Sequence, residues 1–453
     1  MEREELEQLI EEVKGYLENN DYSRLRALLN EQEPFDLAGL CEEIDEAQLP
    51  FVFRLIEKDR AAECFANMSS ELQELIVRKM SDAELKAMLD EMFVDDTVDV
   101  IQEMPANVAA RMLKNSDPET REQINEILNY PKDSAGSIMT TEYVRLNQNM
   151  SVADAFTRIR RVGYEKETIY TCYVTDSDRT LVGVVTAMDL MLSETDTLIS
   201  EIMETNVISA TTGDDRESVV IKFSDYGFLA LPVVDLGNRL VGIVTVDDAI
   251  DVALEEATED VEKMAGITPS DKPYLKVGVI STWLSRVPWL MLLMLSATLT
   301  GAIISSYENA LSKLVILTSF IPMLMGTAGN AGGQSSVTII RALSLGDVVP
   351  GDILRILWKE LRVSFLCGIS LAVVGYFKAI WLDGAEPMVA LVVCLTLLAT
   401  VVAAKVVGCG FPVLIKKLGF DPAVVASPFI TTVIDALALV VYFAVATAII
   451  PTL

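Results

Sequence analysis

The stretch "PMLMGTAGNAGGQSS", Pro322 to Ser336, decides how the second half of the chain folds. It holds one proline and four glycines in fifteen residues, between the apolar segments "LVILTSFI" and "VTIIRAL". So many Gly and Pro residues predict a broken helix. Within a membrane, irregular backbone is tolerated only where it is buried in protein or lines a water-filled cavity. We therefore expect this stretch to line a path, with Asn330 and Gln334 as its polar groups. Close packing of small residues between helices is the alternative.

Charge divides the 453 residues into two parts. The first 272 residues carry 58 Asp and Glu against 25 Lys and Arg, whereas the rest carry 8 against 11. Five apolar runs in the second part approach or exceed the roughly 20 residues that a membrane-spanning helix needs. They lie at about residues 287–305, 314–343, 363–382, 388–411 and 424–450. The sequence therefore predicts an acidic soluble part and an α-helical membrane domain of five spans over residues 273–453.

The distribution of Lys and Arg predicts the orientation of these spans. The N-terminus, "MEREELEQLIEEVKGYLE", has neither the basic start nor the apolar core of a signal peptide, so we expect it in the cytoplasm. Five spans of a cytoplasmic membrane then place the C-terminus outside. The segments expected inside hold most of the bases, in agreement with the positive-inside rule. These bases are Arg286, Arg341, Arg355, Lys359, Arg362, Lys416 and Lys417, against Lys313 and Lys378 outside.

Methionines recur every twelve residues at Met68, Met80, Met92 and Met104. Each opens a unit with helix-capping residues followed by apolar residues at helical spacing, as in "KMSDAELKAMLD". Repeats of one short helix stack into a superhelix. We therefore expect residues 1–132 to form an all-α superhelical domain with the methionines in its core.

Strand and helix patterns alternate after residue 133, and they occur twice. The openings "SIMTTEYV" and "EIMETNVI" match, as do the closings "LVGVVTAMDL" and "LVGIVTVDDA", which place Gly183 and Gly242 59 residues apart. The duplication resembles a tandem pair of CBS domains, an α/β regulatory module, over residues 133–203 and 204–245.

The CBS resemblance also implies a candidate ligand. In that family the Thr and Asp of the closing motif often contact a ribose, which makes an adenine nucleotide such as ATP a candidate ligand of Thr186, Asp189 and Tyr170. A carboxylate can accept both ribose hydroxyls, and a helix start beside it can receive phosphate. A plain Thr–Asp helix cap is the alternative, and it needs no ligand.

Residues 246–268 predict an acidic helix between the soluble part and the membrane. The segment "VDDAIDVALEEATEDVEKM" has apolar residues at helical spacing and eight acids, with Lys263 as its only base. Like charges on one helix repel one another. The helix is therefore expected to need a counter-cation or a basic partner surface.

Asp435 is the only ionisable residue of the last span, "VVASPFITTVIDALALVVYFAVATAII". About eleven helical residues from the cytoplasmic end place it roughly 16 Å deep, near the bilayer midplane. A charge at that depth is costly, so we expect a functional role. Lys405 in the fourth span is the competing feature: it either pairs with Asp435 or extends to the cytoplasmic face.

The residue types restrict the chemistry. The chain has no His, and its six Cys form no CxxC motif, so a soft transition-metal site is disfavoured and a hard cation held by oxygen atoms is favoured. The sequence shows neither a nucleophile with its base nor a Walker glycine loop. We therefore expect neither an enzyme nor an ATP-driven pump.

The order of a helical domain, a CBS pair, an acidic helix and five spans resembles the MgtE family of magnesium channels over essentially the whole chain. The segments "PMLMGTAGNAGGQ", "DPAVVASPFITTVID" and "VDDAIDVALEEATEDVEKMAG" resemble that family's second-span, fifth-span and plug-helix motifs. The resemblance implies a homodimer with its pore on the dimer axis, where Asp435 faces a hydrated Mg²⁺ and Asn330 and the backbone near Ala426 line the same site. Gly333 stands where the family commonly has Asn, and Lys405 where it often has a neutral polar residue.

We therefore expect a Mg²⁺ channel that cytoplasmic Mg²⁺ closes. Mg²⁺ gives up its waters reluctantly, so amide, carbonyl and carboxylate oxygens, Gln334 among them, can select it through those waters. Acids of the soluble part would repel one another in an open state and be bridged by Mg²⁺ in a closed one. The candidate sensor residues are Asp95, Asp99, Asp214, Asp215, Asp247, Asp251, Glu255, Glu256 and Glu259. Acidity for solubility alone, transport of Co²⁺ or Mn²⁺, and a membrane-anchored nucleotide sensor are the alternatives.

Overall fold

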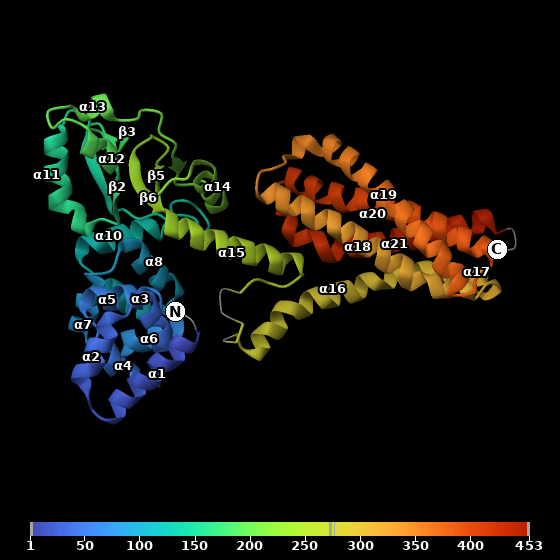
Figure 1. The fold of residues 1–453 in the computed structure, drawn as a ribbon, viewed down its shortest axis with the longest axis horizontal. Helices are drawn as coiled ribbons and strands as arrows, with labels where there is room; N and C mark the ends of the chain where they lie inside the picture. Colours follow the sequence, from blue (N-terminus) through green and yellow to red (C-terminus); the bar gives the residue numbers. More distant parts are fainter. Residues whose placement is uncertain (1–2, 271–273, 276, 451–453) are drawn as a thin grey trace. The chain divides into compact units, whose positions relative to one another are not determined.

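The computed structural model describes residues 3–270, 274, 275 and 277–450, with only the backbone of residues 425–428 (Figure 1). The chain forms two compact units, Met1–Val252 and Ala253–Leu453. The first contains short helices and two small sheets, and the second contains helices of up to 31 residues.

Ten helices precede the first strand among the described residues. They are α1 (Arg3–Glu18), α2 (Tyr22–Glu31), α3 (Pro34–Glu42), α4 (Leu49–Phe53), α5 (Lys58–Ala66), α6 (Ser70–Lys79), α7 (Asp82–Leu89), α8 (Val94–Glu103), α9 (Ala106–Asn115) and α10 (Pro118–Ile127). From α5 to α10, each helix begins twelve residues after the one before. The predicted helical repeat is therefore confirmed, with one helix in each unit.

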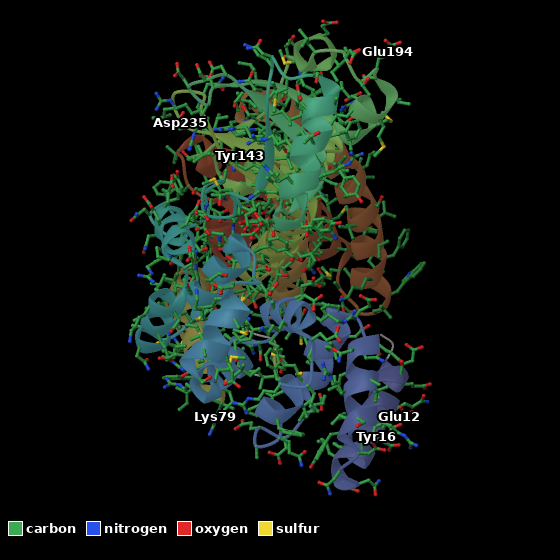
Figure 2. All side chains as sticks on the ribbon, turned by 90° about the vertical axis from the view of Figure 1, so that its left-hand side faces the viewer. Glu12, Tyr16, Lys79, Tyr143, Glu194 and Asp235 are labelled. Carbon is green, nitrogen blue, oxygen red and sulfur yellow. The ribbon has the colours of Figure 1, made fainter. Side chains whose placement is uncertain are left out.

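The methionine ladder belongs to the core of these helices, as the sequence predicts. Met68, Met92 and Met104 are buried, and Met80 packs against the same cluster. Caps delimit the helices: at the start of α7, the Ser81 hydroxyl accepts the Glu84 N–H, and the Glu84 carboxylate accepts the Ser81 N–H. Figure 2 shows Glu12 of α1 at the periphery of this helical region, where acidic side chains meet solvent.

Two three-stranded sheets follow, and both have the same topology. The first contains β1 (Tyr143–Asn147), β2 (Thr168–Thr175) and β3 (Leu181–Thr186), and the second β4 (Ala210–Thr211), β5 (Ala230–Val234) and β6 (Leu240–Thr245). In each, the first strand is parallel to the second and the second antiparallel to the third. The helices are α11 (Val152–Val162), α12 (Ala187–Leu192), α13 (Ile199–Ile202) and α14 (Arg216–Tyr226). The predicted α/β duplication is confirmed.

The two copies exchange their opening segments. Gly183 of β3 has no room for a Cβ, which would lie 2.7 Å from the sulfur of Met203 in the second opening. Gly242 of β6 is covered in the same way by Met139 of the first opening, also at 2.7 Å. Isolated bridges, Thr140 to Ile243 and Val184 to Glu204, extend the exchange. The glycines of the two closing motifs are therefore explained by close packing, and the pair forms one body.

The acidic segment forms one helix, α15 (Val246–Met264), which ends four residues before the predicted boundary. The second unit continues with α16 (Val279–Ser306), α17 (Glu308–Lys313), α18 (Ile316–Ser344), α19 (Ile353–Trp381), α20 (Pro387–Lys417) and α21 (Pro422–Ile449). Among the described residues, four helices are long and apolar enough to cross a membrane: α16, α19, α20 and α21. α18 is equally long, but its Gly, Asn and Gln residues lower its hydropathy, so this criterion supports four of the five predicted spans.

The predicted break in α18 is wrong. The helix is continuous from Ile316 to Ser344, with Pro322 and all four glycines inside it. A proline removes only one backbone hydrogen bond, and a backbone in apolar surroundings has no water with which to replace its internal bonds. The glycines instead permit close helix contacts. α20 packs against α18, α19 and α21, as Figure 1 shows, and α18 also packs against α21.

Candidate functional site

A cavity of about 770 Å³ lies between α18 and α21, and we call it the membrane groove. Its lining residues are Met325, Gly326, Gly329, Asn330, Gly333, Gln334, Val337, Thr338, Thr431 and Asp435. The structure thus brings together three of the four residues that the sequence proposes for the pore, Asn330, Gln334 and Asp435. Ala426, the fourth, belongs to the residues whose side chains lie outside the described part of α21.

Small residues bring these two helices close to each other. A Cβ on Gly329 would lie 3.5 Å from the Thr431 side chain and 3.7 Å from a carboxylate oxygen of Asp435. One turn further along α18, a Cβ on Gly332 would collide with Ile434. The helix packing that the sequence offers as an alternative is therefore present, and it shapes the groove instead of excluding it.

Lys405 follows neither of the two predicted arrangements. Its ammonium group donates to the Ser335 hydroxyl at 3.1 Å and lies 3.6 Å from a carboxylate oxygen of Glu360. The side chain is buried, so it does not extend to the cytoplasmic face. The sequence prediction overlooked Glu360, the acid of α19 with which Lys405 pairs.

A second candidate site in the first unit consists of three carboxylates, which we call the acidic cluster. One oxygen each of Asp95, Glu142 and Glu167 lies within 4.8 Å of the other two. Asp95 is in the first turn of α8, and the two glutamates directly precede β1 and β2. These strands pair in parallel with Tyr143 opposite Thr168, so their register places Glu142 and Glu167 side by side.

Burial and mutual repulsion make these carboxylates unusually weak acids. Burial, followed by the charges of Asp248 and Asp96, raises the pKa of Glu167 to about 8. Burial also raises the pKa of Asp95 well above its usual range, with Asp248 as the next cause. The pKa of Asp248 itself is raised to about 6 by burial, against the lowering effect of its hydrogen bond with Thr245. A dication would relieve this repulsion directly.

The donor set of the acidic cluster suits a hard cation. Oδ1 of Asp95 and Oε2 of Glu167 are buried and have no hydrogen-bond partner within the described residues. Buried oxygens normally have hydrogen-bond partners, so two unpartnered carboxylate oxygens in one cluster favour the binding of a positive ligand there. Carboxylate oxygens are the ligands that Mg²⁺ and Ca²⁺ prefer.

The other predicted sensor residues have different surroundings. Asp214 pairs with Lys222 at 3.0 Å and accepts from Thr211; although burial raises its pKa, these hydrogen bonds lower it overall. Asp215 caps α14 by accepting the Glu217 N–H at 2.8 Å. Both acids thus have structural roles. Asp99 is exposed on α8, one turn after Asp95.

The acids of α15 divide between the two units. Asp247 lies near the acidic cluster, where its charge helps to raise the pKa of Asp96 to about 6, after burial and Asp248. Burial and Asp247 together raise the pKa of Asp251. Glu255, Glu256 and Glu259 belong to the second unit, where Glu259 pairs with Lys263 at 2.7 Å.

The last turns of α15 contact the C-terminal end of α18 and the N-terminal end of α21. Lys263 pairs with Asp421, the N-cap of α21, at 2.8 Å. Ser344, the last residue of α18, donates to the Asp260 carboxylate at 3.2 Å. Met264 packs against an apolar cluster that includes residues of α18, α20 and α21. The single base of this acidic helix therefore has a defined partner.

Thr186 and Asp189 form a reciprocal cap at the start of α12. The Thr186 hydroxyl donates to Oδ2 of Asp189 at 2.6 Å, and the Asp189 N–H donates back at 3.1 Å. Tyr170 of β2 is 66% exposed. The helix cap that the sequence offers as an alternative is present, and Oδ1 of Asp189 takes no part in it.

The sequence matches three known families over most of its length. They are a divalent cation transporter family, MgtE, over residues 321–445, the MgtE intracellular N domain over 32–133, and CBS domains over 135–194 and 199–255. The magnesium transporter MgtE of Thermus thermophilus is 36% identical over 443 residues, which cover 97% of this chain and 98% of that protein. The magnesium transporter MgtE of Bacillus subtilis is 33% identical over 452 residues, 99% and 98% of the two chains.

Solved structures resemble the first unit. The cytosolic domain of the Mg²⁺ channel MgtE, solved in complex with ATP, has 36% identity and a TM-score of 0.51, and it covers 53% of this chain and 98% of that one. The soluble part of a magnesium transporter has 33% identity and a TM-score of 0.52, and it covers 56% of this chain and 99% of that one.

Proposed function

This chain belongs to the MgtE family of magnesium transporters, and we propose that it is a Mg²⁺-selective channel whose ions pass along the membrane groove. The family consists of transporters, not enzymes. The observation that carries the proposal is the position of Asp435, a carboxylate of an apolar membrane helix, opposite the amides of Asn330 and Gln334.

The lining of the groove suits an ion that keeps its water. Mg²⁺ binds its first shell of water tightly and usually retains several of these molecules when it is bound. A cavity of about 770 Å³ accommodates such a hydrated ion. Asn330 and Gln334 can hydrogen-bond to its waters, and Asp435 supplies the negative charge. Contact through water holds the ion weakly enough for it to leave again.

A homodimer completes this path. The groove belongs to two helices and contains a single carboxylate, so a second copy related by a two-fold axis would close it and supply a second Asp435. We propose that α18 crosses the membrane together with the four more apolar helices, with the N-terminal domains in the cytoplasm and the C-terminus outside. The match to an intracellular N domain supports this orientation.

Mg²⁺ in the cytoplasm is proposed to close the channel through the acidic cluster. Asp95 comes from the helical domain, whereas Glu142 and Glu167 come from the CBS pair, so a bound ion would hold the two parts together. Without the ion, repulsion between these carboxylates favours separation, and with it they are bridged. Asp247 and Asp251 of α15 are proposed to take part through their charge.

The closed state is transmitted by α15, which we propose to be a plug helix. Its first turns carry Asp247 and Asp248 beside the acidic cluster, and its last turns contact the ends of α18 and α21 through Asp260 and Lys263. An α-helix transmits a displacement along its axis, so a change at one end moves contacts at the other.

ATP is proposed to modulate this gate without driving transport. A relative's cytosolic domain was solved with ATP, and Thr186, Asp189 and Tyr170 are the residues that we propose to contact the nucleotide here. Asp248 of the other Thr–Asp pair instead contributes to the electrostatics of the acidic cluster.

Cation uptake by the purified full chain in proteoliposomes tests the proposed function. Mg²⁺, Mn²⁺, Co²⁺ and Ca²⁺ are each supplied at the same gradient, and internal Mg²⁺ is varied separately. We expect Mg²⁺ flux to exceed the others and to fall as Mg²⁺ rises on the cytoplasmic side. A faster Co²⁺ or Mn²⁺ flux would change the proposed substrate, and no flux of any divalent cation would refute the channel.

A further inference from the structure

A buried network joins three membrane helices directly behind the groove. It consists of Lys405 on α20, Ser335 on α18 and Glu360 on α19. The side chains of the lysine and the glutamate are only 7% and 13% exposed, and Ser335 is 2% exposed. Neither charge faces the groove, because none of the three residues is among those that line it.

The Ser335 hydroxyl is the centre of this network. It donates its one proton to Oε2 of Glu360 at 2.7 Å and accepts a proton from the Lys405 ammonium at 3.1 Å. The two charged groups are themselves 3.6 Å apart. One atom of α18 is therefore bound simultaneously by side chains from the two neighbouring helices, and both bonds are strengthened by charge.

Ser335 directly follows Gln334, which lines the groove. Consecutive residues of an α-helix point about 100° apart, so a rotation of α18 by one position would carry Gln334 into the place of Ser335, inside the protein, and Gly333 into the place of Gln334 in the groove. Close backbone contact restricts sliding nearby, since a Cβ on Gly408 of α20 would collide with the carbonyl oxygen of Gly332. Backbone contact between small residues alone permits rotation, whereas a hydrogen bond to a single hydroxyl does not.

Stability alone does not account for a buried ion pair. Desolvation of two charges opposes their attraction, and apolar replacements of such pairs are often equally stable. Buried polar contacts are best understood where they select one arrangement among several. We propose that Lys405, Ser335 and Glu360 are positioning residues for conduction, which fix the rotation of α18 so that Asn330 and Gln334 face the groove. This inference rests on the proposed function of the groove.

Variants of the full chain remove the network in steps. Ser335→Ala removes both hydrogen bonds, and Lys405→Met combined with Glu360→Gln removes both charges, so that neither is left buried alone. Lys405→Arg keeps the charge and is the conservative variant. Arg355→Gln combined with Asp352→Asn is the matched control, because this exposed ion pair of 3.1 Å lies at the start of the same helix α19.

The first readout is permeation in proteoliposomes. In Ser335→Ala and in the charge-free double variant, we expect the half-saturating Mg²⁺ concentration or the ratio of Mg²⁺ to Co²⁺ flux to change by roughly two- to thirtyfold, the range for residues that act through others. Lys405→Arg and the control should keep the parent values, and all variants should elute and melt as assembled protein. Parent values in both network variants would overturn the inference and leave the network as a structural contact.

The second readout does not depend on transport. Gln334→Cys is introduced after the six native cysteines are replaced. The rate at which this cysteine reacts with a water-soluble maleimide is measured in the parent chain and in the charge-free double variant. We expect the reaction to slow severalfold when Lys405 and Glu360 are neutralised, because position 334 turns away from water. An unchanged rate would refute the fixed rotation. If the parent chain itself carries no Mg²⁺, the proposed function fails while this labelling still decides the position of α18.

Discussion

The membrane groove and the acidic cluster use the same functional group in opposite ways. In the groove, Asp435 is the single acid among neutral amides and glycines. In the acidic cluster, Asp95, Glu142 and Glu167 crowd together, with Asp248 adding to their repulsion. A lone carboxylate attracts a hydrated ion without removing its water, whereas several carboxylates can replace that water. Under the proposed function, the number of acidic groups, and not their chemical type, separates the site for ion passage from the site for sensing.

Removal of the groove carboxylate should have the largest effect. We expect Asp435→Ala and Asp435→Asn to reduce Mg²⁺ uptake to the background of empty liposomes, because no other acid lines the described groove. Asp347→Ala is the control, since this acid is exposed in the loop after α18. Uptake is measured after assembly is checked by elution volume. Substantial flux in assembled Asp435→Ala would remove the central residue of the proposal.

Neutralising the acidic cluster should leave conduction intact but weaken its control. For Asp95→Asn combined with Glu142→Gln, we expect the Mg²⁺ concentration that halves the flux to rise about a hundredfold, at about tenfold for each lost carboxylate. Limited proteolysis of residues 1–272 provides a second measurement, with about 10 mM Mg²⁺ against NaCl of equal ionic strength.

The control for this pair is Asp214→Asn, because Asp214 already pairs with Lys222. It should retain the parent response to Mg²⁺. If NaCl protects the parent from proteolysis as well as Mg²⁺ does, the acids serve solubility, and the proposed Mg²⁺ sensor is refuted.

The two Thr–Asp pairs allow the cytoplasmic side to be divided further. Asp189→Ala should weaken ATP binding by about tenfold, as expected for loss of a charged hydrogen bond. Asp248→Ala should leave ATP binding unchanged and alter the response to Mg²⁺, because Asp248 lies near the acidic cluster. Calorimetry on residues 1–272 with ATP measures both. Equal loss of ATP binding in the two variants would mean that the copies are not specialised.

The pH dependence of stability should show the smallest effect. The pKa of Glu167 is raised from 4.5 to about 8 in the folded protein, so the folded state binds more protons than the unfolded chain between these values. Without Mg²⁺, stability should therefore fall as pH rises through this window, by roughly 2–4 °C in melting temperature for each kcal/mol. The chain contains no His to obscure this titration.

Differential scanning calorimetry of residues 1–272 from pH 5.5 to 8.5 measures this change of melting temperature with pH. Glu167→Gln should flatten it, and Mg²⁺ should do the same by replacing the protons. A melting temperature that rises with pH in the Mg²⁺-free parent would contradict the assignment of a buried, repulsive cluster.

Periodic features of the sequence predicted the fold well. The twelve-residue repeat of methionines corresponds to the starts of α5 to α10, because each unit needs only local helix signals. The 59-residue duplication likewise gave two sheets of one topology. Asn330, Gln334 and Asp435 all line the groove. This agrees with the expectation that the few polar residues of apolar helices face a protein interior or a cavity.

The features that were missed depend on tertiary structure. Glu142 and Glu167 come together only through the parallel register of β1 and β2, which no local pattern reveals. Lys405 pairs with Glu360 of the neighbouring helix α19, and this pairing depends on the rotation of the two helices about their axes. The continuity of α18 was missed because propensities measured in water overstate the cost of glycine in a helix with apolar surroundings.

The exchanged opening segments of the CBS pair place a constraint on synthesis. Met139 is synthesised first, and Gly242, against which it packs, follows roughly 100 residues later. At ribosomal rates this delay is about 5 to 20 s. During that interval the segment around Met139 and Thr140 lacks its final partner, because Thr140 bridges to Ile243. Neither copy can reach its native state as a nascent chain on its own. The pair becomes stable only when translation has passed β6, just before α15 and the first membrane helix emerge.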